Sequence, residues 1–367
     1  MINVIKSELP DIKLYFKYLK KIWKNNWVTN NGEFLQLLEK KLETHLKVKH
    51  VLAVTNGTLA IQLALRALDL RGEVITTPYT FAATTNSIIW EGLTPVFADI
   101  DRATFNLDPR SVERQITKKT SAILAVHVYG NSCDNTELRK IADKYNLKLI
   151  YDAAHAFGVE LNGRSILGFG DLSALSFHAT KTFHTVEGGA IVSNDTKLHE
   201  KMVLLRDFGI QSEEKIVLPG INAKMNEFQA AMGLCNFDGL EKNRAKRKLI
   251  YEKYKNLLGV NNAINFQKLT VSKYNYSYMP VYFVNKKIRD GVFNTLLNHG
   301  VKARKYFYPL TCDFEFFKTR GENLVQKYKL ENAKFISDRI LCLPIYPSLE
   351  LQDVEKISKI IHDFLSQ

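Results

Sequence analysis

The sequence predicts an α/β protein: a large domain with a mostly parallel, mixed sheet between helices, followed by a smaller C-terminal α+β domain. Two observations support this class. Short apolar runs alternate with helical patterns from Val51 to Asn194, which is typical of a parallel sheet covered on both faces. From about Phe237 the pattern changes to a long basic helix followed by scattered elements. We therefore expect one domain over residues 1–236 and a second over residues 237–367.

The individual elements follow from the spacing of apolar residues. The segment up to about Val48 is helical in pattern with an aromatic-rich centre, and we expect it to pack on the larger domain or on a partner subunit. The expected strands are Val51–Thr55, Glu73–Thr77, Pro95–Ile100, Ser121–Val128, Leu147–Asp152, Ala174–Phe177 and Ala190–Ser193. The expected helices are Leu59–Leu70, Ala83–Glu91, Ser111–Lys118, Thr136–Tyr145, a basic helix from about Phe237 to Leu258, and an amphipathic helix at Leu351–Leu365.

Composition excludes several classes of protein. Hydrophobic residues make up 46% and charged residues 24%, as in ordinary globular proteins. No stretch approaches the roughly 20 apolar residues of a membrane span, and the N-terminus lacks the pattern of a signal peptide. The four cysteines are scattered, without the spacing of a zinc site or a disulfide framework. We expect a reduced, cytoplasmic protein with no metal site and no membrane partner.

The net charge of +13 raises the question of nucleic-acid binding. Lys and Arg are spread along the chain, however, and no nucleic-acid module is visible. The densest basic run, Glu241–Lys248, has the spacing of a solvated helix face. We expect no nucleic-acid partner, and the charge favours a small anionic substrate only weakly.

Ligands of such sheets bind beyond the carboxyl ends of the strands, so the chemistry is expected in the loops that follow them. The first of these loops is Asn56-Gly57-Thr58, between a strand and a helix. Glycine allows the backbone to approach a ligand closely, and the helix start offers free N–H groups to a phosphate, with the Thr58 hydroxyl as a further donor. A plain N-cap turn has the same pattern.

A carboxylate ends a later strand. Asp152 follows the apolar run from Leu147 and is itself followed by two alanines and His155. It has the position to pair with a buried cation, which in a pyridoxal phosphate enzyme is the protonated ring nitrogen that draws off electrons. His155 is a candidate donor to the phenolic oxygen of the same ring. On pattern alone, a helix-capping role for Asp152 is equally open, and a lone His is more often structural.

Lys181 stands in a polar loop after the strand that ends near Phe177, with Ser176 just before it and Gly188-Gly189 leading into the next strand. Lysine is the amine that forms Schiff bases, and burial near another cation lowers its pKa enough to do so. Most loop lysines are merely solvated. The order of an acid, then Ser176 and Lys181, favours a functional role. Phe81, in the loop after another strand, is a ring that can stack on a flat cofactor or simply pack.

Taken in order, these motifs resemble the sugar aminotransferases of the DegT/DnrJ/EryC1/StrS family. The resemblance implies the fold type I (aspartate aminotransferase-like) architecture and pyridoxal 5'-phosphate as cofactor, and it runs from about Trp27 to Pro347. Its landmarks are Trp27-Val28-Thr29-Asn30-Asn31-Gly32, Asn56-Gly57-Thr58, Pro78-Tyr79-Thr80-Phe81, Pro95-Val96-Phe97-Ala98-Asp99-Ile100, His127-Val128-Tyr129-Gly130, Asp152-Ala153-Ala154-His155, Ser176-Phe177-His178-Ala179-Thr180-Lys181, Glu187-Gly188-Gly189, Asn222-Ala223-Lys224-Met225 and Leu343-Pro344-Ile345-Tyr346-Pro347.

The resemblance also implies roles for single residues. Lys181 matches the lysine that carries the cofactor as a Schiff base, and Asp152 matches the partner of the pyridine nitrogen. Asn222 matches an asparagine that reaches the phosphate from the neighbouring subunit, which implies a homodimer with shared active sites. Lys224 departs from the arginine that many members carry, so contacts from this loop are in doubt. The remaining cofactor contacts fall on Gly57, Thr58, Ser176, Phe81 and His155.

The chemistry implied is a ping-pong amino transfer from L-glutamate to a nucleotide-linked keto sugar, with Lys181 as general base and then general acid. The segment Glu187-Gly188-Gly189 is typical of 4-aminotransferases. The segments around Lys181 and Lys224 are most similar to enzymes that make dTDP-4-amino-4,6-dideoxy-D-glucose from dTDP-4-keto-6-deoxy-D-glucose. Surface glycan (O-antigen) biosynthesis is the process that the family suggests.

Three alternatives remain open from the sequence. One is a 3-aminotransferase acting on a dTDP-3-keto-6-deoxyhexose. Another is a sugar dehydratase of the same fold, although those relatives carry His where this chain has Lys181. The last is a non-catalytic nucleotide-sugar-binding module, which would require the set of Asp152, Ser176 and Lys181 to be broken.

Overall fold

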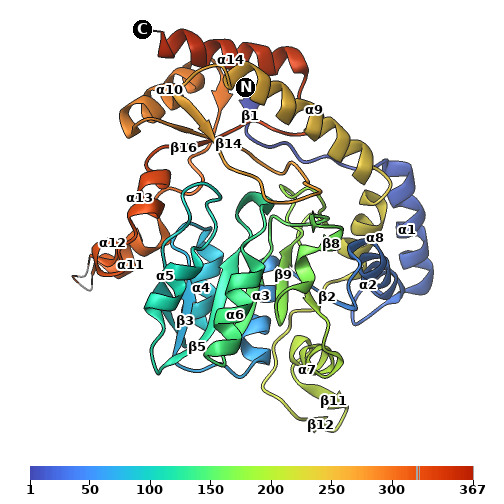
Figure 1. The fold of residues 1–367 in the computed structure, drawn as a ribbon. Coiled ribbons are helices and arrows are strands. Elements are labelled where there is room, and N and C mark those ends of the chain that lie inside the picture. The colour runs from blue at the N-terminus through green and yellow to red at the C-terminus, as the bar shows by residue number, and fades with distance from the viewer. Residues whose placement is uncertain (320, 322, 367) are drawn as a thin grey trace.

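The computed structural model describes residues 1–319, 321 and 323–366 (Figure 1). Its centre is a seven-stranded sheet in which β10 alone runs antiparallel to its neighbours. The predicted mostly parallel, mixed sheet is therefore confirmed. In spatial order the strands are β2 (His50–Val54), β10 (Gly189–Ser193), β9 (Leu172–Ser176), β6 (Lys148–Asp152), β5 (Thr120–Val126), β3 (Glu73–Thr76) and β4 (Thr94–Phe97).

Helices cover both faces of this sheet because successive strand residues point to opposite sides. In β5, Leu124 packs into a core formed with α3, α4 and α7, whereas Ala125 packs into a second core formed with α5 and α6. In β2, Ala53 faces a third core that contains α2 and α8. The helices are α2 (Glu33–Leu46), α3 (Gly57–Ala67), α4 (Ala82–Trp90), α5 (Pro109–Gln115), α6 (Asn135–Lys144), α7 (Thr196–Arg206) and α8 (Glu227–Asn236).

Most predicted elements differ from the structure by a few residues at one or both ends: the strand predicted at Pro95–Ile100, for example, ends at Phe97. Capping residues explain two of the differences at helix starts. Helix α3 begins at Gly57 rather than at the predicted Leu59. The side chain of Asn56 accepts a hydrogen bond from the Leu59 N–H at 2.9 Å and so caps the helix at this earlier position. Similarly, α5 begins at Pro109 because Asp108 caps it and proline is favoured in the first helical turn. Short pairs and turns complete this part of the chain: β7 (Glu160–Leu161), β8 (Arg164–Ser165), β11 (Ile210–Ser212), β12 (Lys215–Ile216), η1 (Val128–Gly130) and η2 (Ile166–Gly168).

The N-terminal segment packs on a helix that covers the large sheet. Packing on the larger domain is one of the two predicted arrangements; the other is packing on a partner subunit. Helix α1 (Ile12–Asn25) lies against α8, where the Tyr15 hydroxyl donates to the Phe228 carbonyl at 3.2 Å and the rings of Trp23 and Phe228 meet edge to face. Much of its aromatic surface is nevertheless exposed: Phe16, and Trp23 despite its contact with Phe228, are both exposed.

The C-terminal part is an antiparallel sheet covered by helices, as expected for an α+β unit. The predicted boundary falls between α8 and α9, and it stays a prediction. The strands of this sheet are β13 (Ile264–Phe266), β14 (Met279–Phe283) and β16 (Ile340–Leu343). The helices are α9 (Leu240–Leu258), α10 (Lys286–Asn298), α11 (Glu315–Lys318), α12 (Leu324–Lys327), α13 (Glu331–Ser337) and α14 (Leu351–Leu365). A short 3-10 turn, η3 (Thr311–Asp313), precedes α11.

Among the contacts between the C-terminal part and the rest of the described residues, two bear on the position of the site. The first strand, β1 (Ile2–Asn3), pairs in parallel with β15 (Val301–Lys302). One apolar cluster joins Tyr79 and Phe97, which lie at the carboxyl edge of the large sheet, to Phe307 and its neighbours. This second contact places the segment after β15 directly beside the edge where ligands of such sheets bind.

Among the described residues, no helix has the length and apolarity that a membrane crossing requires.

Candidate active site

The predicted site residues follow strands whose carboxyl ends share one edge of the sheet. Strands β2 and β9 both run antiparallel to β10, and β9 is parallel to β6, β5 and β3 in turn. The loops after β2, β3, β6 and β9 therefore open on the same side. Those loops carry, respectively, Gly57, Phe81, Asp152 with His155, and Lys181.

The start of α3 and the end of β9 are in close contact. A Cβ atom placed on Gly57 would lie 2.8 Å from the Ser176 Cβ and 3.2 Å from its hydroxyl oxygen, so only glycine fits there. Asn56 caps the Leu59 amide, which leaves the Gly57 and Thr58 amides without an acceptor among the described residues. Two free N–H groups at a helix start beside the Ser176 hydroxyl have the donor chemistry of a phosphate site. The residues present thus fit the phosphate of pyridoxal phosphate.

Asp152 is buried, with 5% of its surface exposed. Its Oδ2 accepts a hydrogen bond from the Thr84 hydroxyl at 2.6 Å, and its Oδ1 accepts one from the Ala154 N–H at 3.1 Å. Burial raises the pKa of Asp152, and these two donors and the nearby Lys181 oppose that rise. A buried carboxylate with few donors gains most from a cationic partner, which is what a protonated ring nitrogen would be.

Lys181 lies close enough to Asp152 for the two charges to interact. Its backbone N–H bonds to the His178 carbonyl at 2.8 Å, which closes a tight turn after β9. The side chain is partly exposed, but the surrounding protein removes enough water to lower the pKa of Lys181 to about 8, while Asp152 acts in the opposite direction. An amine with that pKa is about half uncharged, and so available as a nucleophile, at about pH 8.

His155 is buried and its orientation is fixed. The Tyr129 N–H donates to the His155 Nδ1 at 3.2 Å, so the neutral ring carries its proton on Nε2. The Phe307 ring stacks on it with an interplanar angle of 7°. Burial lowers the pKa of His155 well below its usual value, with a smaller contribution from Lys181. His155 is therefore a neutral donor, as contact with a phenolic oxygen requires.

Two predicted residues lie outside this buried group. Phe81 is the N-cap residue of α4 and is 56% exposed, so its ring is free to cover a flat ligand. Asn222 is exposed and forms an isolated antiparallel β-bridge with Asp207. Its neighbour Lys224, the departure from the family pattern, pairs with Asp207 at 2.5 Å and is thus engaged within its own loop. The structure of one chain leaves the predicted role of Asn222 untested.

Sequence reasoning missed Thr84, which contacts Asp152 directly. No helical spacing indicates it, because Thr80 precedes the N-cap residue of α4 and reaches the Thr84 hydroxyl from outside the helix. It also missed Phe307, because no local pattern shows that a residue after β15 stacks on His155.

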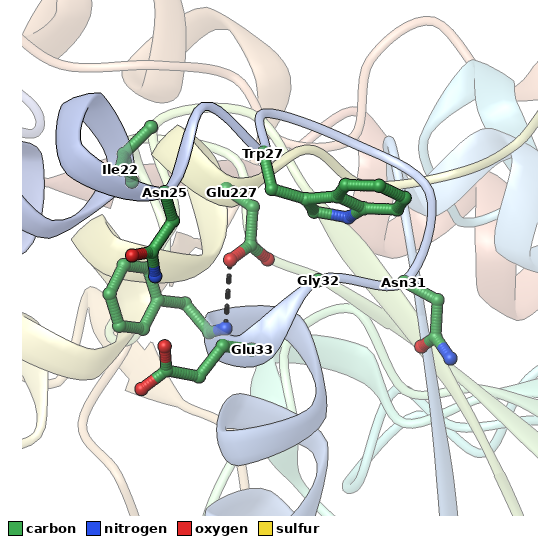
Figure 2. Close-up of a pocket in the computed structure, with 8 residues that line it drawn as sticks. Ile22, Asn25, Trp27, Asn31, Gly32, Glu33 and Glu227 are labelled. Atoms are coloured by element: carbon green, nitrogen blue, oxygen red, sulfur yellow. Dashed lines mark hydrogen bonds between the residues drawn. The ribbon is translucent and has the colours of Figure 1, made fainter.

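A separate cavity of about 270 Å³ lies between α1, α2 and α8 (Figure 2), and none of the predicted site residues lines it. Here the Glu227 carboxylate accepts hydrogen bonds from the Phe34 and Leu35 amides, both at 2.9 Å. It caps α2, because Gly32 has no side chain to do so. A Cβ on Gly32 would lie 2.4 Å from the Glu227 carboxyl carbon. The glycine that ends the family motif Trp27–Gly32 is therefore explained by packing: only glycine leaves room for the Glu227 carboxylate that caps α2.

The geometry defines the class: a fold type I enzyme with the residues for pyridoxal phosphate and a lysine to react with it. The chain belongs to the DegT/DnrJ/EryC1/StrS aminotransferase family, whose pattern matches residues 11–362. It is 43% identical to a dTDP-4-amino-4,6-dideoxy-D-glucose transaminase of Escherichia coli, over 98% of each chain.

Solved structures agree with this assignment. The crystal structure of DesI, determined in the presence of its TDP-sugar product, has a TM-score of 0.91 and 33% identity and covers 98% of this chain and 92% of its own. NtdA from Bacillus subtilis, solved with bound cofactor PMP, has a TM-score of 0.89 and 28% identity over 97% of this chain and 82% of its own. The protein is a pyridoxal phosphate-dependent sugar aminotransferase, which confirms the predicted fold, cofactor and class of enzyme.

The pKa of Lys181 predicts how the protein reacts with its cofactor. Without cofactor, Lys181 should react faster with pyridoxal phosphate as the pH rises towards about 8, and the rate should then level off, because only the uncharged amine is a nucleophile. Borohydride trapping at a series of pH values, followed by peptide mass analysis, measures this rate at Lys181 itself. A rate that still rises steeply above about pH 10, as for a solvated lysine, would contradict the assignment.

Proposed function

We propose that this protein transfers an amino group from L-glutamate to a nucleotide-linked 4-keto-6-deoxy sugar. The specific reaction proposed is conversion of dTDP-4-keto-6-deoxy-D-glucose into dTDP-4-amino-4,6-dideoxy-D-glucose for surface glycan biosynthesis. The observation that carries the proposal is the 43% identity over 98% of the chain to a transaminase of that name. The segment Glu187-Gly188-Gly189 after the lysine supports the same position of amination.

The residue roles belong to the proposal. Bound pyridoxal phosphate supplies an electron sink for the carbanion formed at the substrate. The Gly57 and Thr58 amides and the Ser176 hydroxyl bind its phosphate, and Phe81 covers the exposed face of its ring. Asp152 holds the positive charge of the ring nitrogen, and the His155 Nε2–H donates to the phenolic oxygen.

Lys181 does the proton transfer. Its amine takes the proton from the substrate carbon that bears the amino group, and in the second half of the cycle it returns a proton to the sugar carbon that receives the amine. The lowered pKa of Lys181 suits both steps, because a group with a pKa near the working pH serves as base and as acid. Asp152 stabilises the carbanion indirectly, because its negative charge favours the protonated ring nitrogen that draws off the electrons.

The proposal includes a homodimer with shared sites, in which Asn222 of each subunit reaches the phosphate in the other. Two observations support it: Asn222 is exposed, and apolar side chains near it, including Phe208 and Ile221, are also exposed. A single-chain mass in sedimentation experiments on the active enzyme would contradict this part.

The sugar is tested with a panel of substrates. Incubation with L-glutamate, pyridoxal phosphate and matched 3-keto and 4-keto nucleotide sugars should give an aminated product only from the 4-keto compounds, with the new C–N bond at carbon 4 by NMR. Mass spectrometry detects the exchange of oxygen for an amino group. Amination at carbon 3 alone would refute the choice of sugar, and the 3-aminotransferase would then stand.

A further inference from the structure

Three hydroxyl and carboxyl groups form a buried chain behind the proposed ring-nitrogen site. The Thr80 and Thr84 hydroxyl oxygens are 2.8 Å apart, and the Thr84 hydroxyl is 2.6 Å from the Asp152 Oδ2. Both threonines are buried, Thr84 completely. A buried hydroxyl that contacts a carboxylate at this distance forms a short, charge-assisted hydrogen bond.

The direction of each bond follows from the number of protons. An ionised carboxylate can only accept hydrogen bonds, so the single hydroxyl proton of Thr84 is donated to Asp152. Thr80 must then donate to the Thr84 oxygen. The two bonds point the same way, and a donor to Thr84 makes Thr84 a better donor to the carboxylate.

The contacts also fix the plane of the carboxylate. Each oxygen of Asp152 has one donor, the Thr84 hydroxyl on Oδ2 and the Ala154 N–H on Oδ1. Neither donor belongs to the strand that carries Asp152: Thr84 lies on α4 and Ala154 in the loop after β6. A lone pair of each oxygen remains for a further donor, and the direction in which it points is set by these two bonds.

We propose that Thr84, supported by Thr80, is a positioning residue that orients the Asp152 carboxylate and holds its negative charge for the ring nitrogen of the cofactor. The inference rests on the proposed role of Asp152. It adds to that role a residue on another element, so that the register of α4 against β6 determines how strongly the cofactor is bound and activated.

The chain offers a closely matched control. Thr85 is the next residue of α4, is also fully buried, and donates its hydroxyl proton to the Thr311 hydroxyl at 2.8 Å rather than to Asp152. Thr84→Val and Thr85→Val therefore remove the same group from the same helix. Thr84→Ser keeps the donor, and Thr80→Val removes only the second bond of the chain.

The first measurement is the dissociation constant of pyridoxal phosphate. We expect Thr84→Val to raise it about tenfold or more, as loss of a hydrogen bond to a charged group does. Thr80→Val should raise it less, and Thr84→Ser and Thr85→Val should leave it near the wild-type value. Equal effects of Thr84→Val and Thr85→Val would overturn the inference, because the loss would then be one of packing.

The second measurement needs no cofactor. Burial raises the pKa of Asp152, and loss of the Thr84 donor should raise it further, while Lys181 and the neutral His155 ring stay in place beside it. A carboxyl whose pKa is higher in the folded than in the unfolded chain lowers the free energy of unfolding as the pH rises, because the folded chain must then hold a charge that water stabilises better in the unfolded chain. The Tm of cofactor-free Thr84→Val should therefore fall further below wild type at about pH 8 than at about pH 5.

A fall in Tm that is the same at both pH values would overturn the inference, and that is the result expected for Thr85→Val. If Thr84→Val does not fold, Thr80→Val carries the same test with a smaller effect. Failure of the proposed function has a different signature: the wild type itself would bind no pyridoxal phosphate, while the pH dependence of the cofactor-free variants would still report on Thr84 and Asp152.

Discussion

Lys181→Ala is expected to abolish amino transfer, lowering kcat by about four orders of magnitude or more, because the variant loses both the amine that binds the cofactor and the group that moves the proton. The protein should also lose the visible absorbance that pyridoxal phosphate acquires when it is joined to the lysine. Its fold should persist, since the side chain is partly exposed and interacts with Asp152 only through charge.

Stopped-flow absorbance with L-glutamate alone isolates the first half of the reaction, in which Lys181→Ala should show no measurable turnover. Lys246→Ala, an exposed lysine on α9, is the control and should behave as wild type. An Ala variant that keeps its colour and its first half-reaction would show that another amine carries the cofactor.

Asp152→Asn is expected to have the second-largest effect, a fall in kcat of about 10² to 10⁴. The amide has nearly the volume of the carboxylate, and its oxygen can still accept from Thr84. Its NH2 group then faces the Ala154 N–H, so the variant loses that hydrogen bond together with the negative charge. Without that charge the ring nitrogen keeps its proton less readily, and the electron sink is weakened. Cofactor binding should weaken at least as much as in Thr84→Val, but a saturating concentration of pyridoxal phosphate should still load the variant, because the proposed phosphate contacts at Gly57 and Ser176 are unchanged.

Asp171→Asn is the matched control. Asp171 also accepts a hydrogen bond from a backbone amide, the Leu149 N–H at 2.7 Å, but it precedes β9 and so lies at the opposite edge of the sheet. This variant should lose stability and keep its kcat. If both asparagine variants retain full kcat, Asp152 is not the partner of the ring nitrogen, and the first half-reaction of Asp152→Asn would show this most directly.

The sequence predicts the fold well because the sheet is made of short apolar runs between well-capped helices. The strand at Leu147–Asp152 ends at the predicted residue, and the helix at Leu351–Leu365 has the predicted bounds at both ends. The start of α3 was missed by two residues, since its position depends on the Asn56 side chain rather than on apolar spacing.

The site divides in a similar way. Residues at strand ends, such as Asp152 and Lys181, are predictable because topology alone brings them to one edge. Phe307 is not, since its contact with His155 depends on how a distant segment folds back over that edge. The role of Asn222 stays a prediction, because the phosphate that it is predicted to reach belongs to the site of a second chain.

The pairing of β1 with β15 has a consequence for how the chain is made. The first strand, Ile2–Asn3, has its hydrogen-bonding partner at Val301–Lys302, so it cannot complete this contact until most of the polypeptide has left the ribosome. The central sheet, with strands between His50 and Ser193, is fully synthesised long before that point. Ile2 and Asn3 are therefore synthesised before the central sheet but should become ordered after it.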